Sequence, residues 1–279
     1  MKKISRRSFL AAAGLSVAAL ALTACGGSSA NTASSVASSA ASSEAASTSA
    51  AAGELTTVEA GKLTMATNAA FPPYEMTTDA GEFEGIDIET AQAIADKLGL
   101  ELQIDDMDFD AALLSVQQGK ADIVMAGVTV TDERKAVMDF SDSYATGIQS
   151  IIVPEGSDIA SPDDLAGKKI GTQRGTTGYI YCSDDFGDDN VVAYDDGLTA
   201  VQALNNGQVD AVVIDNAPAK EFVAANPGLV ILDTSYAEED YAMGMAKGSS
   251  LEDAVNAALE ELKADGTLQS IVDKYITAE

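Results

Sequence analysis

Short apolar runs that alternate with amphipathic stretches are the feature that most restricts how this chain can fold. In the first part, apolar residues recur at helical spacing between Ile88 and Leu98, and Gly99 then ends the helix. The predicted order there is strand 63–67, helix 88–98, strand 102–104, helix 109–118 and strand 121–126. Strands and helices in alternation predict an α/β fold with largely parallel sheets.

The same alternation resumes after residue 148. A serine followed by a proline at Ser161 and Pro162 opens a short helix in the order that helix starts favour. The other predicted elements are strands 148–153, 169–172, 211–215 and 242–246, and helices 198–206, 217–225, 251–264 and 268–275. A chain of this length is long enough to build two lobes around two cores.

One segment of the chain is echoed by a later one. The run SVQQGKADIVMA over 115–126 resembles ALNNGQVDAVVI over 203–214, and each predicts a helix, a glycine, an aspartate and a strand. Any helix-glycine-strand unit resembles another to some extent, so coincidence is the alternative. If the echo is real, two lobes share one construction, and a ligand is expected beyond the carboxyl ends of their strands.

Arginine is scarce, because only Arg134 and Arg174 occur after residue 25 among 44 acidic residues in the chain. Arg134 follows a glycine and two threonines at short spacing, which is chemistry suited to an anion, and guanidinium fits a carboxylate with two parallel hydrogen bonds. The alternative is a solvated residue in the first turn of a helix capped by Thr131. The strand that ends the first echoed segment leads on to Arg134, and the strand that ends the second leads to Asp215. A cation and an anion are therefore expected to face each other between the lobes. That arrangement suits a zwitterion.

The N-terminus predicts a targeting segment over 1–25. Four basic residues precede an apolar stretch over 9–22, which is too short to span a bilayer comfortably. The run Leu22-Thr23-Ala24-Cys25 resembles a bacterial lipoprotein box, so Cys25 is expected to be lipidated and to anchor the chain to the outer face of the cell membrane. The arginine pair resembles a twin-arginine export signal, and a general secretory signal is the alternative. Residues 26–53 are almost entirely serine, alanine, threonine and glycine, which predicts a flexible tether.

Composition excludes several function classes. A formal net charge of −28 repels nucleic acid, and the absence of histidine excludes Ser-His-Asp and Cys-His catalysis and histidine-ligated zinc. With Cys25 lipidated, Cys182 has no disulfide partner and is expected to be a small packed or semi-exposed residue. The acidic pairs at 184–185 and 188–189 lack the spacing of a calcium loop. We therefore expect no catalytic residue, no metal and no cofactor.

Five motifs, in order, carry a resemblance to a known family. They are NAAFPPYE over 68–75, GIDIETAQAIA over 85–95, TVTDERKAVMDFS over 129–141, GTQRGTTG over 171–178 and VVID over 212–215. The chain resembles bacterial polar-amino-acid-binding lipoproteins, the substrate-binding components of ABC importers (solute-binding protein family 3), and the resemblance spans nearly all of 54–279. It implies a monomer with the type II periplasmic-binding-protein fold. Lobe 1 would span 54–147 plus 243–279 and lobe 2 would span 148–242, with hinge strands near 144–148 and 239–243. An ABC permease and its ATPase would be the partners.

The resemblance also implies a role for each site residue. Arg134 would clamp the α-carboxylate of the ligand with Thr129 and the backbone of Gly127, and Thr176 and Thr177 would close on it from the other lobe. Asp215 would take the α-ammonium, with a backbone carbonyl near Gly127. The remaining expected ligand-binding residues are Asn68, Phe71, Phe109, Ala126 and Gln173.

Simpler interpretations stay open beside these roles. Asp215, Thr176 and Thr177 could only cap helices, and Phe71 and Phe109 could be ordinary core. Arg174 is expected to be exposed or at the rim of the pocket. Several relatives carry an aspartate at the position of Asn68, and some carry a lysine at that of Gln173, so the two amides favour a neutral polar amino acid. A dehydratase of the cyclohexadienyl type, or a ligand-sensing receptor, is the alternative function.

Overall fold

The computed structural model describes residues 55–276. The signal peptide, the lipidated Cys25 and the tether predicted for 1–53 lie outside the described residues. Within 55–276, no helix combines the length and the apolar character needed to cross a membrane.

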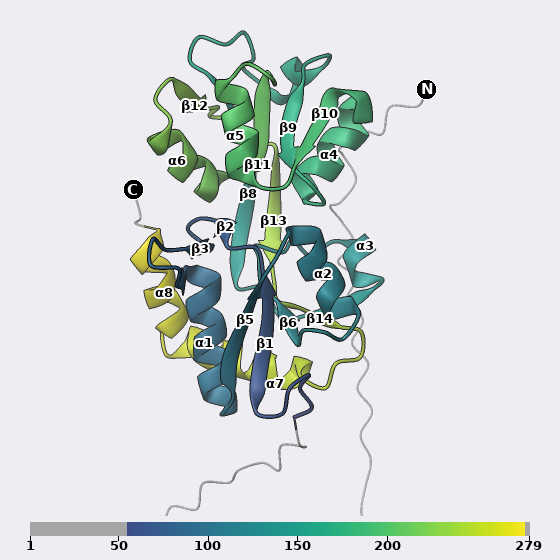
Figure 1. The fold of residues 1–279 in the computed structure, drawn as a ribbon, viewed down its shortest axis with the longest axis vertical. Helices are drawn as coiled ribbons and strands as arrows, with labels where there is room; N and C mark the ends of the chain where they lie inside the picture. Colours follow the sequence, from purple (N-terminus) through teal and green to yellow (C-terminus); the bar gives the residue numbers. More distant parts are fainter. Residues whose placement is uncertain (1–54, 277–279) are drawn as a thin grey trace, which may run out of the picture. The chain divides into compact units, whose positions relative to one another are not determined.

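The sheet of the first lobe has five strands in the order β5-β1-β6-β14-β7 (Figure 1). Its members are β1 (Lys62–Thr67), β5 (Glu101–Asp106), β6 (Ile123–Val124), β7 (Met138–Phe140) and β14 (Gly244–Ala246). β5 and β6 pair in parallel with β1, and β14 runs antiparallel to both β6 and β7. The helices of this lobe are α1 (Ile86–Leu98), α2 (Phe109–Gln117), α3 (Asp132–Lys135), α7 (Glu252–Ala264) and α8 (Thr267–Tyr275). A small sheet, β2 (Ala70–Phe71), β3 (Glu75–Thr77) and β4 (Phe83–Glu84), adjoins them.

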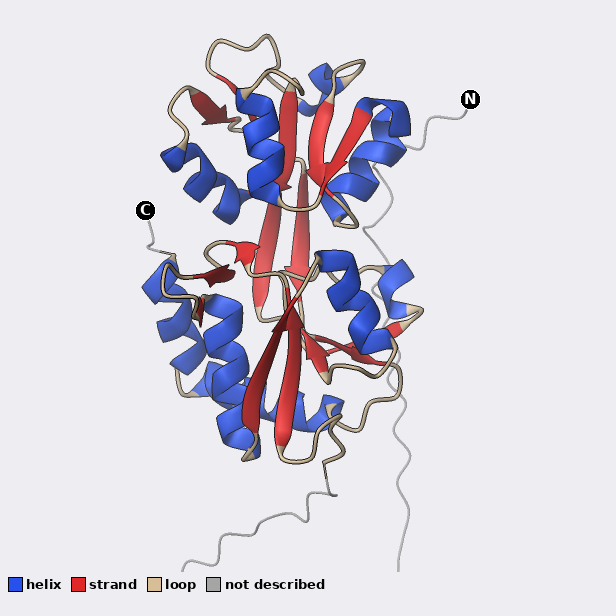
Figure 2. Ribbon diagram, viewed as in Figure 1, coloured by secondary structure: helices blue, strands red, loops and turns tan. Residues whose placement is uncertain are grey.

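The sheet of the second lobe has the order β10-β9-β11-β8-β12, and β13 pairs with β8. Its members are β8 (Ala145–Pro154), β9 (Ile170–Gln173), β10 (Val191–Tyr194), β11 (Ala211–Asp215), β12 (Leu229–Ile231) and β13 (Ala237–Tyr241). The helices are α4 (Thr177–Phe186), α5 (Gly197–Asn205) and α6 (Asn216–Ala225), with short 3-10 turns at Pro162–Leu165 and Asp188–Asn190. Figure 2 shows helices beside the strands of both sheets. The two-lobed α/β fold expected from the sequence is confirmed, with one strand in each sheet, β14 and β8, running against its neighbours.

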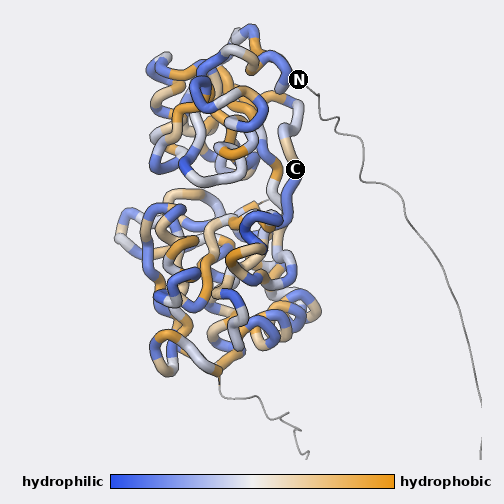
Figure 3. The backbone as a smooth tube through the Cα atoms, turned by 90° about the vertical axis from the view of Figure 1, so that its right-hand side faces the viewer, coloured by the Kyte–Doolittle hydropathy of each residue, from blue (hydrophilic) through white to orange (hydrophobic). Residues whose placement is uncertain are grey.

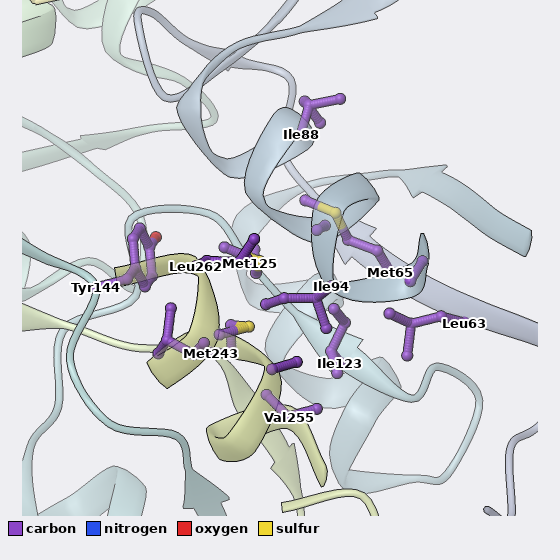
Figure 4. Close-up of a cluster of buried hydrophobic side chains, with 14 of the residues drawn as sticks. Leu63, Met65, Ile88, Ile94, Ile123, Met125, Tyr144, Met243, Val255 and Leu262 are labelled. Carbon is purple, nitrogen blue, oxygen red and sulfur yellow. The ribbon is translucent and has the colours of Figure 1, made fainter. Parts of the chain in front are cut away.

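Alternating side chains of the strands explain how the first lobe packs. Leu63 and Met65 of β1 pack with apolar residues of α1, α7 and α8, whereas Ala66 points to the other face, against α2. Figure 4 shows part of the larger cluster, in which Ile94, Val255 and Leu262 meet the strand residues. Successive side chains of a strand point to opposite faces of the sheet, so a sheet that is covered on both faces needs apolar residues at odd and even positions alike. Figure 3 shows hydrophobic and hydrophilic residues interspersed along the described chain.

The echoed segments form the same structure twice. Gly119 and Gly207 both have positive φ angles, +65° and +68°, where glycine is favoured after a helix. Lys120 N donates to Ser115 O at 2.9 Å, and the matching bond from Gln208 N to Ala203 O is also 2.9 Å. A carboxylate then ties each strand to its neighbour, since Asp122 accepts from Thr64 N and Asp210 from Lys169 N, both at 2.7 Å. The structural equivalence predicted from the echo is confirmed.

The sequence patterns did not predict α4, β10 and β12 of the second lobe, or the small sheet β2-β3-β4. α4 buries only three of its ten residues, Thr177, Gly178 and Cys182, so it lacks the apolar periodicity that marks a helix. Thr176 starts it by accepting a hydrogen bond from Tyr179 N. Cys182 is fully buried rather than semi-exposed, and burial raises the pKa of its thiol to about 12.

Candidate ligand-binding site

All eleven residues predicted to bind a ligand line one pocket with about 440 Å³ of empty space. They come from both lobes. The predicted lining residues between positions 68 and 134 belong to the first lobe, and those between positions 173 and 215 lie at or after strand ends of the second sheet. Five further lining residues were not predicted: Glu75, Gln149, Val213, Ile214 and Tyr241.

Arg134 lies at one end of this pocket with its side chain buried, so the solvated first-turn interpretation is wrong. Thr131 does cap the short helix α3, as that interpretation expected, by accepting a bond from Arg134 N at 3.2 Å. The guanidinium donates to two backbone carbonyls, Thr129 O at 2.9 Å and Gly175 O at 3.1 Å. Its Cζ atom lies 5.4 Å from the ring centroid of Phe109, a cation–π contact.

The charge of Arg134 is balanced at a distance rather than by contact. Among the described residues, no carboxylate lies within 4.0 Å of its guanidinium. Burial lowers the pKa of Arg134, and the charge of Glu239 opposes this. Since arginine is effectively always protonated, the site holds a permanent positive charge whose fork is occupied only by neutral carbonyls.

Threonine hydroxyls and a carboxylate surround the guanidinium. The Thr129 hydroxyl donates to Glu239 at 3.1 Å and lies 3.4 Å from the Thr177 hydroxyl of the other lobe. Gln149 donates to the same Glu239 oxygen at 2.9 Å, so that carboxylate has two side-chain donors. Thr177 is 2 % exposed and lies in the first turn of α4, where a helix presents free backbone N–H groups.

The loop from Gln173 to Thr177 brings the second lobe against the first. Gly175 has a φ of +74°, and a Cβ at this position would lie 1.6 Å from Oδ1 of Asp110. The positive φ favours glycine here, and a larger residue would also require the exposed Asp110 carboxyl to move before the loop could present its carbonyl to Arg134. Thr176 is a cap, as one interpretation expected, and its hydroxyl also donates to Gln173 O at 2.8 Å.

Asp215, at the carboxyl end of β11, also lines the pocket, and we call its surroundings the aspartate end. Oδ1 accepts from Ala217 N at 2.9 Å and so caps α6, as the simpler interpretation expected. Oδ2 faces β8 and β13, where it accepts from Ile148 N at 2.8 Å and from the Tyr241 hydroxyl at 3.0 Å. Burial raises the pKa of Asp215 to about 6, against the three donors that lower it.

Two more carboxyls lie at this end of the pocket. Asp87 of α1 accepts a hydrogen bond from Gly127 N at 3.0 Å, which fixes the strand-end loop, and burial raises its pKa to about 6. Glu75 of β3 lines the pocket and is fully buried. Burial, followed by the charge of Asp87, raises the pKa of Glu75 well above its usual value. Both acids stand in motifs that carried the resemblance, but a buried acid and an exposed one look alike in a sequence.

Two amides join the lobes at a third side of the pocket. Gln173 Nε2 donates to Asn68 Oδ1 at 2.8 Å, and Asn68 in turn donates to Met107 O at 3.0 Å. Phe109 belongs to the core, as the simpler interpretation expected, and it also lines the pocket, so its contact with a ligand stays a prediction. Phe71 stacks on Tyr74 with ring centroids 5.8 Å apart.

Residues expected to lie outside the site do so. The side chain of Arg174 is 56 % exposed and lies 3.6 Å from Asp195 at the surface. Within residues 55–276, no group of three or more histidine, cysteine or acidic residues is arranged to hold a metal ion.

Comparisons with known proteins agree with this geometry. Residues 63–278 match the family described as bacterial extracellular solute-binding proteins, family 3. The L-cystine-binding protein TcyJ of Escherichia coli is 33% identical over 226 residues, which are 79% of this chain and 85% of that protein. The ABC transporter glutamine-binding protein GlnH of Bacillus subtilis is 33% identical over 202 residues, 71% of this chain and 74% of its own length. Several further relatives are named for arginine.

Solved structures give the same result. The arginine-, lysine-, histidine-binding protein ArtJ of Geobacillus stearothermophilus has a TM-score of 0.75 and 34% sequence identity, over 78% of this chain and 96% of that one. These relatives are transport proteins that bind amino acids, and none of those named here is an enzyme. The chain belongs to the bacterial extracellular solute-binding proteins of family 3, with the two-lobed type II fold.

Proposed function

We propose that this protein captures a free L-amino acid between its lobes and delivers it to an ABC permease driven by its ATPase. The observation that carries the proposal is the pocket itself, which is lined by a buried guanidinium, Arg134, and by a buried carboxylate, Asp215. The two ends match the carboxylate and the ammonium of a zwitterion.

Each end offers donors or acceptors that a ligand would complete. Arg134 binds only neutral carbonyls, so its fork still has donors for an α-carboxylate, and Thr129, Thr176 and Thr177 lie close by. At the other end, Asp215 and the backbone around Ala126 and Gly127 would receive the ammonium. A charge pair at about 4 Å is worth about 4 kcal/mol at an effective dielectric constant of about 20. The two ends could thus supply much of a micromolar affinity of about 8 kcal/mol, less desolvation.

The side chain of the ligand is proposed to be neutral and polar. Asn68 and Gln173 present amide groups to the pocket beside Phe71 and Phe109, and none of these four carries a charge. Relatives named for cystine and glutamine support this assignment, whereas those named for arginine favour a basic ligand. A strongly cationic side chain would find amides here in place of a carboxylate.

Closure is proposed to follow a clamshell motion about two connecting strands. β8 and β13 pair antiparallel, with Ala145 opposite Tyr241 and Ile148 opposite Glu238, and they span the junction predicted at 144–148 and 239–243. We propose lobe 1 as 54–147 plus 243–279 and lobe 2 as 148–242. The protein would act as an exported monomer, anchored by lipidated Cys25 and separated from the membrane by the tether over 26–53.

A thermal-shift screen of the twenty amino acids tests the function. A neutral polar amino acid is expected to give the largest shift in melting temperature. The shift is easily measured, because ligand at 100 times its dissociation constant adds about 2.7 kcal/mol to the free energy of unfolding. A largest shift with arginine would contradict the neutral side chain while leaving the zwitterion pocket intact. The absence of a shift with all twenty would contradict amino-acid binding itself.

A further inference from the structure

The ammonium end of the pocket contains a buried acid that the proposed function does not use. Glu75 is 0 % exposed and lines the same pocket as Arg134 and Asp215. Neither of its carboxyl oxygens accepts a hydrogen bond from a donor among the described residues, and the side chain hydrogen-bonded to it is another carboxyl, Asp87. A fully buried carboxylate without a donor is costly, whereas a protonated carboxyl can donate its proton to the Asp87 carboxylate.

The groups packed around Glu75 make its ionisation harder still. The charges that act on it come from α1, from the end of β11 and from the end of β5, and all are acidic: Asp87, Asp215 and Asp106. The nearby phenols, Tyr74 and Tyr144, have pKa values raised by burial and by these same acids, so they remain neutral. Asp87 and Asp215 each hold backbone N–H donors, while Glu75 has none in hydrogen-bond geometry. The proton of the cluster therefore belongs on Glu75.

We propose that Glu75 is a proton-carrying member of the ammonium subsite, which holds its proton in the free protein and releases it to solvent when the α-ammonium of a ligand enters. This inference rests on the proposed amino-acid function. The O–H bond of the carboxyl breaks, the proton passes to the buffer, and the resulting carboxylate joins Asp215 around the ammonium. The ligand itself keeps its charge throughout.

The mechanism follows from the change in surroundings. The free cluster has acids only, so one of them must stay neutral for the others to ionise. A ligand ammonium supplies the missing cation, and a charge at about 4 Å favours the ionised form by about 3 pKa units at an effective dielectric constant of about 20. Binding and proton release are therefore linked, and affinity is expected to rise with pH.

Isothermal titration calorimetry in two buffers of different ionisation enthalpy counts the protons released. L-glutamine is the probe, replaced by L-arginine if the thermal-shift screen favours it. At about pH 7.5, Asp87 and Asp215 are already largely ionised, because their pKa values are about 6. A release of about half a proton to one proton per ligand is then expected from Glu75 alone, with affinity rising up to about tenfold per pH unit.

Two variants separate the role of Glu75 from a structural one. Glu75→Gln keeps the shape and removes the proton. At about pH 7.5 and above, where Asp87 and Asp215 are ionised, it is expected to bind without releasing protons and with an affinity that no longer depends on pH. Glu84→Gln is the matched control, since Glu84 lies on the neighbouring strand of the same small sheet with its side chain exposed. It is expected to release as many protons as the wild type.

Several outcomes would overturn the inference. Binding without proton release by the wild type, or equal release by Glu75→Gln and wild type, contradicts it while leaving the proposed function in place. No binding of any amino acid removes both. If Glu75→Gln does not fold, infrared difference spectra of the wild type decide. The C=O stretch of a protonated carboxyl must then disappear on addition of the amino acid, and an unchanged band excludes the proposal.

Discussion

At the arginine end of the pocket, one guanidinium is held by two neutral carbonyls, whereas at the aspartate end three buried carboxyls lie close together. The first end has a charge that does not change with pH, because arginine stays protonated. The second has acids whose pKa values are raised by burial, to about 6 for Asp87 and Asp215, so its charge depends on pH and on what is bound. A pocket built in this way fixes the orientation of a zwitterion at one end and adjusts its charge at the other.

Removal of the permanent charge is expected to have the largest effect. Arg134→Ala should weaken amino-acid binding by about 100-fold or more, since truncating one partner of a buried charge pair costs about 2–5 kcal/mol. Arg174→Ala is the control, because the contacts that Arg174 makes with Asp195 and with the carbonyl of Ala193 lie at the surface. Calorimetric titration of both variants measures the difference. Equal affinities for the two would break the assignment of the arginine end.

Asp215→Asn tests the adjustable end and is expected to weaken binding by about 30-fold, which corresponds to about 2 kcal/mol. Asp215 also caps α6, so part of the effect could come from stability alone. Asp196→Asn controls for this, because Asp196 caps α5 by accepting from Thr199 N at 2.7 Å and does not line the pocket. Both variants should lower the melting temperature, and only Asp215→Asn should lower affinity. A parallel loss of affinity in Asp196→Asn would contradict a direct role for Asp215.

Gly175→Ala tests how the second lobe reaches the arginine end. The added Cβ would meet Asp110 and should weaken binding by about tenfold, besides about 1 kcal/mol of backbone strain at positive φ. Gly228→Ala has similar strain, since its φ is +96°, but nothing lies within 4 Å of its added Cβ. Affinity and melting temperature of the two variants separate crowding from strain. An equal loss of affinity in Gly228→Ala would contradict the idea that Gly175 is needed for the 173–177 loop to approach the first lobe.

The smallest expected effect is the pH dependence of stability without ligand. Burial raises the pKa of Asp215 to about 6, so the folded state binds more protons than the unfolded state above about pH 4. This contribution to stability is therefore lost as pH rises through about 6, and the free energy of unfolding of the wild type, relative to Asp215→Asn, should fall by about 1 kcal/mol between about pH 5 and pH 7. Urea unfolding of both proteins measures this difference. A difference that rises with pH would mean that Asp215 is stabilised as a carboxylate.

The family resemblance predicted most of the residues that line the pocket. The positions of strand ends, where sheet topology brings loops together, pointed only to Gly127, Thr129, Arg134 and Asp215. Neither predicted how the residues pair. Asn68 and Gln173 are 105 positions apart and belong to different lobes, so no local pattern reports their hydrogen bond. α4 was not predicted because few of its residues are buried, so its sequence has no apolar periodicity, and its start is marked only by a threonine cap. Glu75 was missed because its burial comes from the packing of both lobes rather than from its neighbours in the chain.

The repeated helix-glycine-aspartate-strand unit has a consequence for how such a protein can change. Asp122 and Asp210 fasten the starts of their strands to neighbouring strands, while Gly127 and Asp215 lie just past or at the strand ends that reach the pocket. The contacts that set strand position are thus separated from those that meet a ligand by the full length of a strand. Substitutions in the pocket can accordingly exchange one preferred amino acid for another while both lobes keep the same framework.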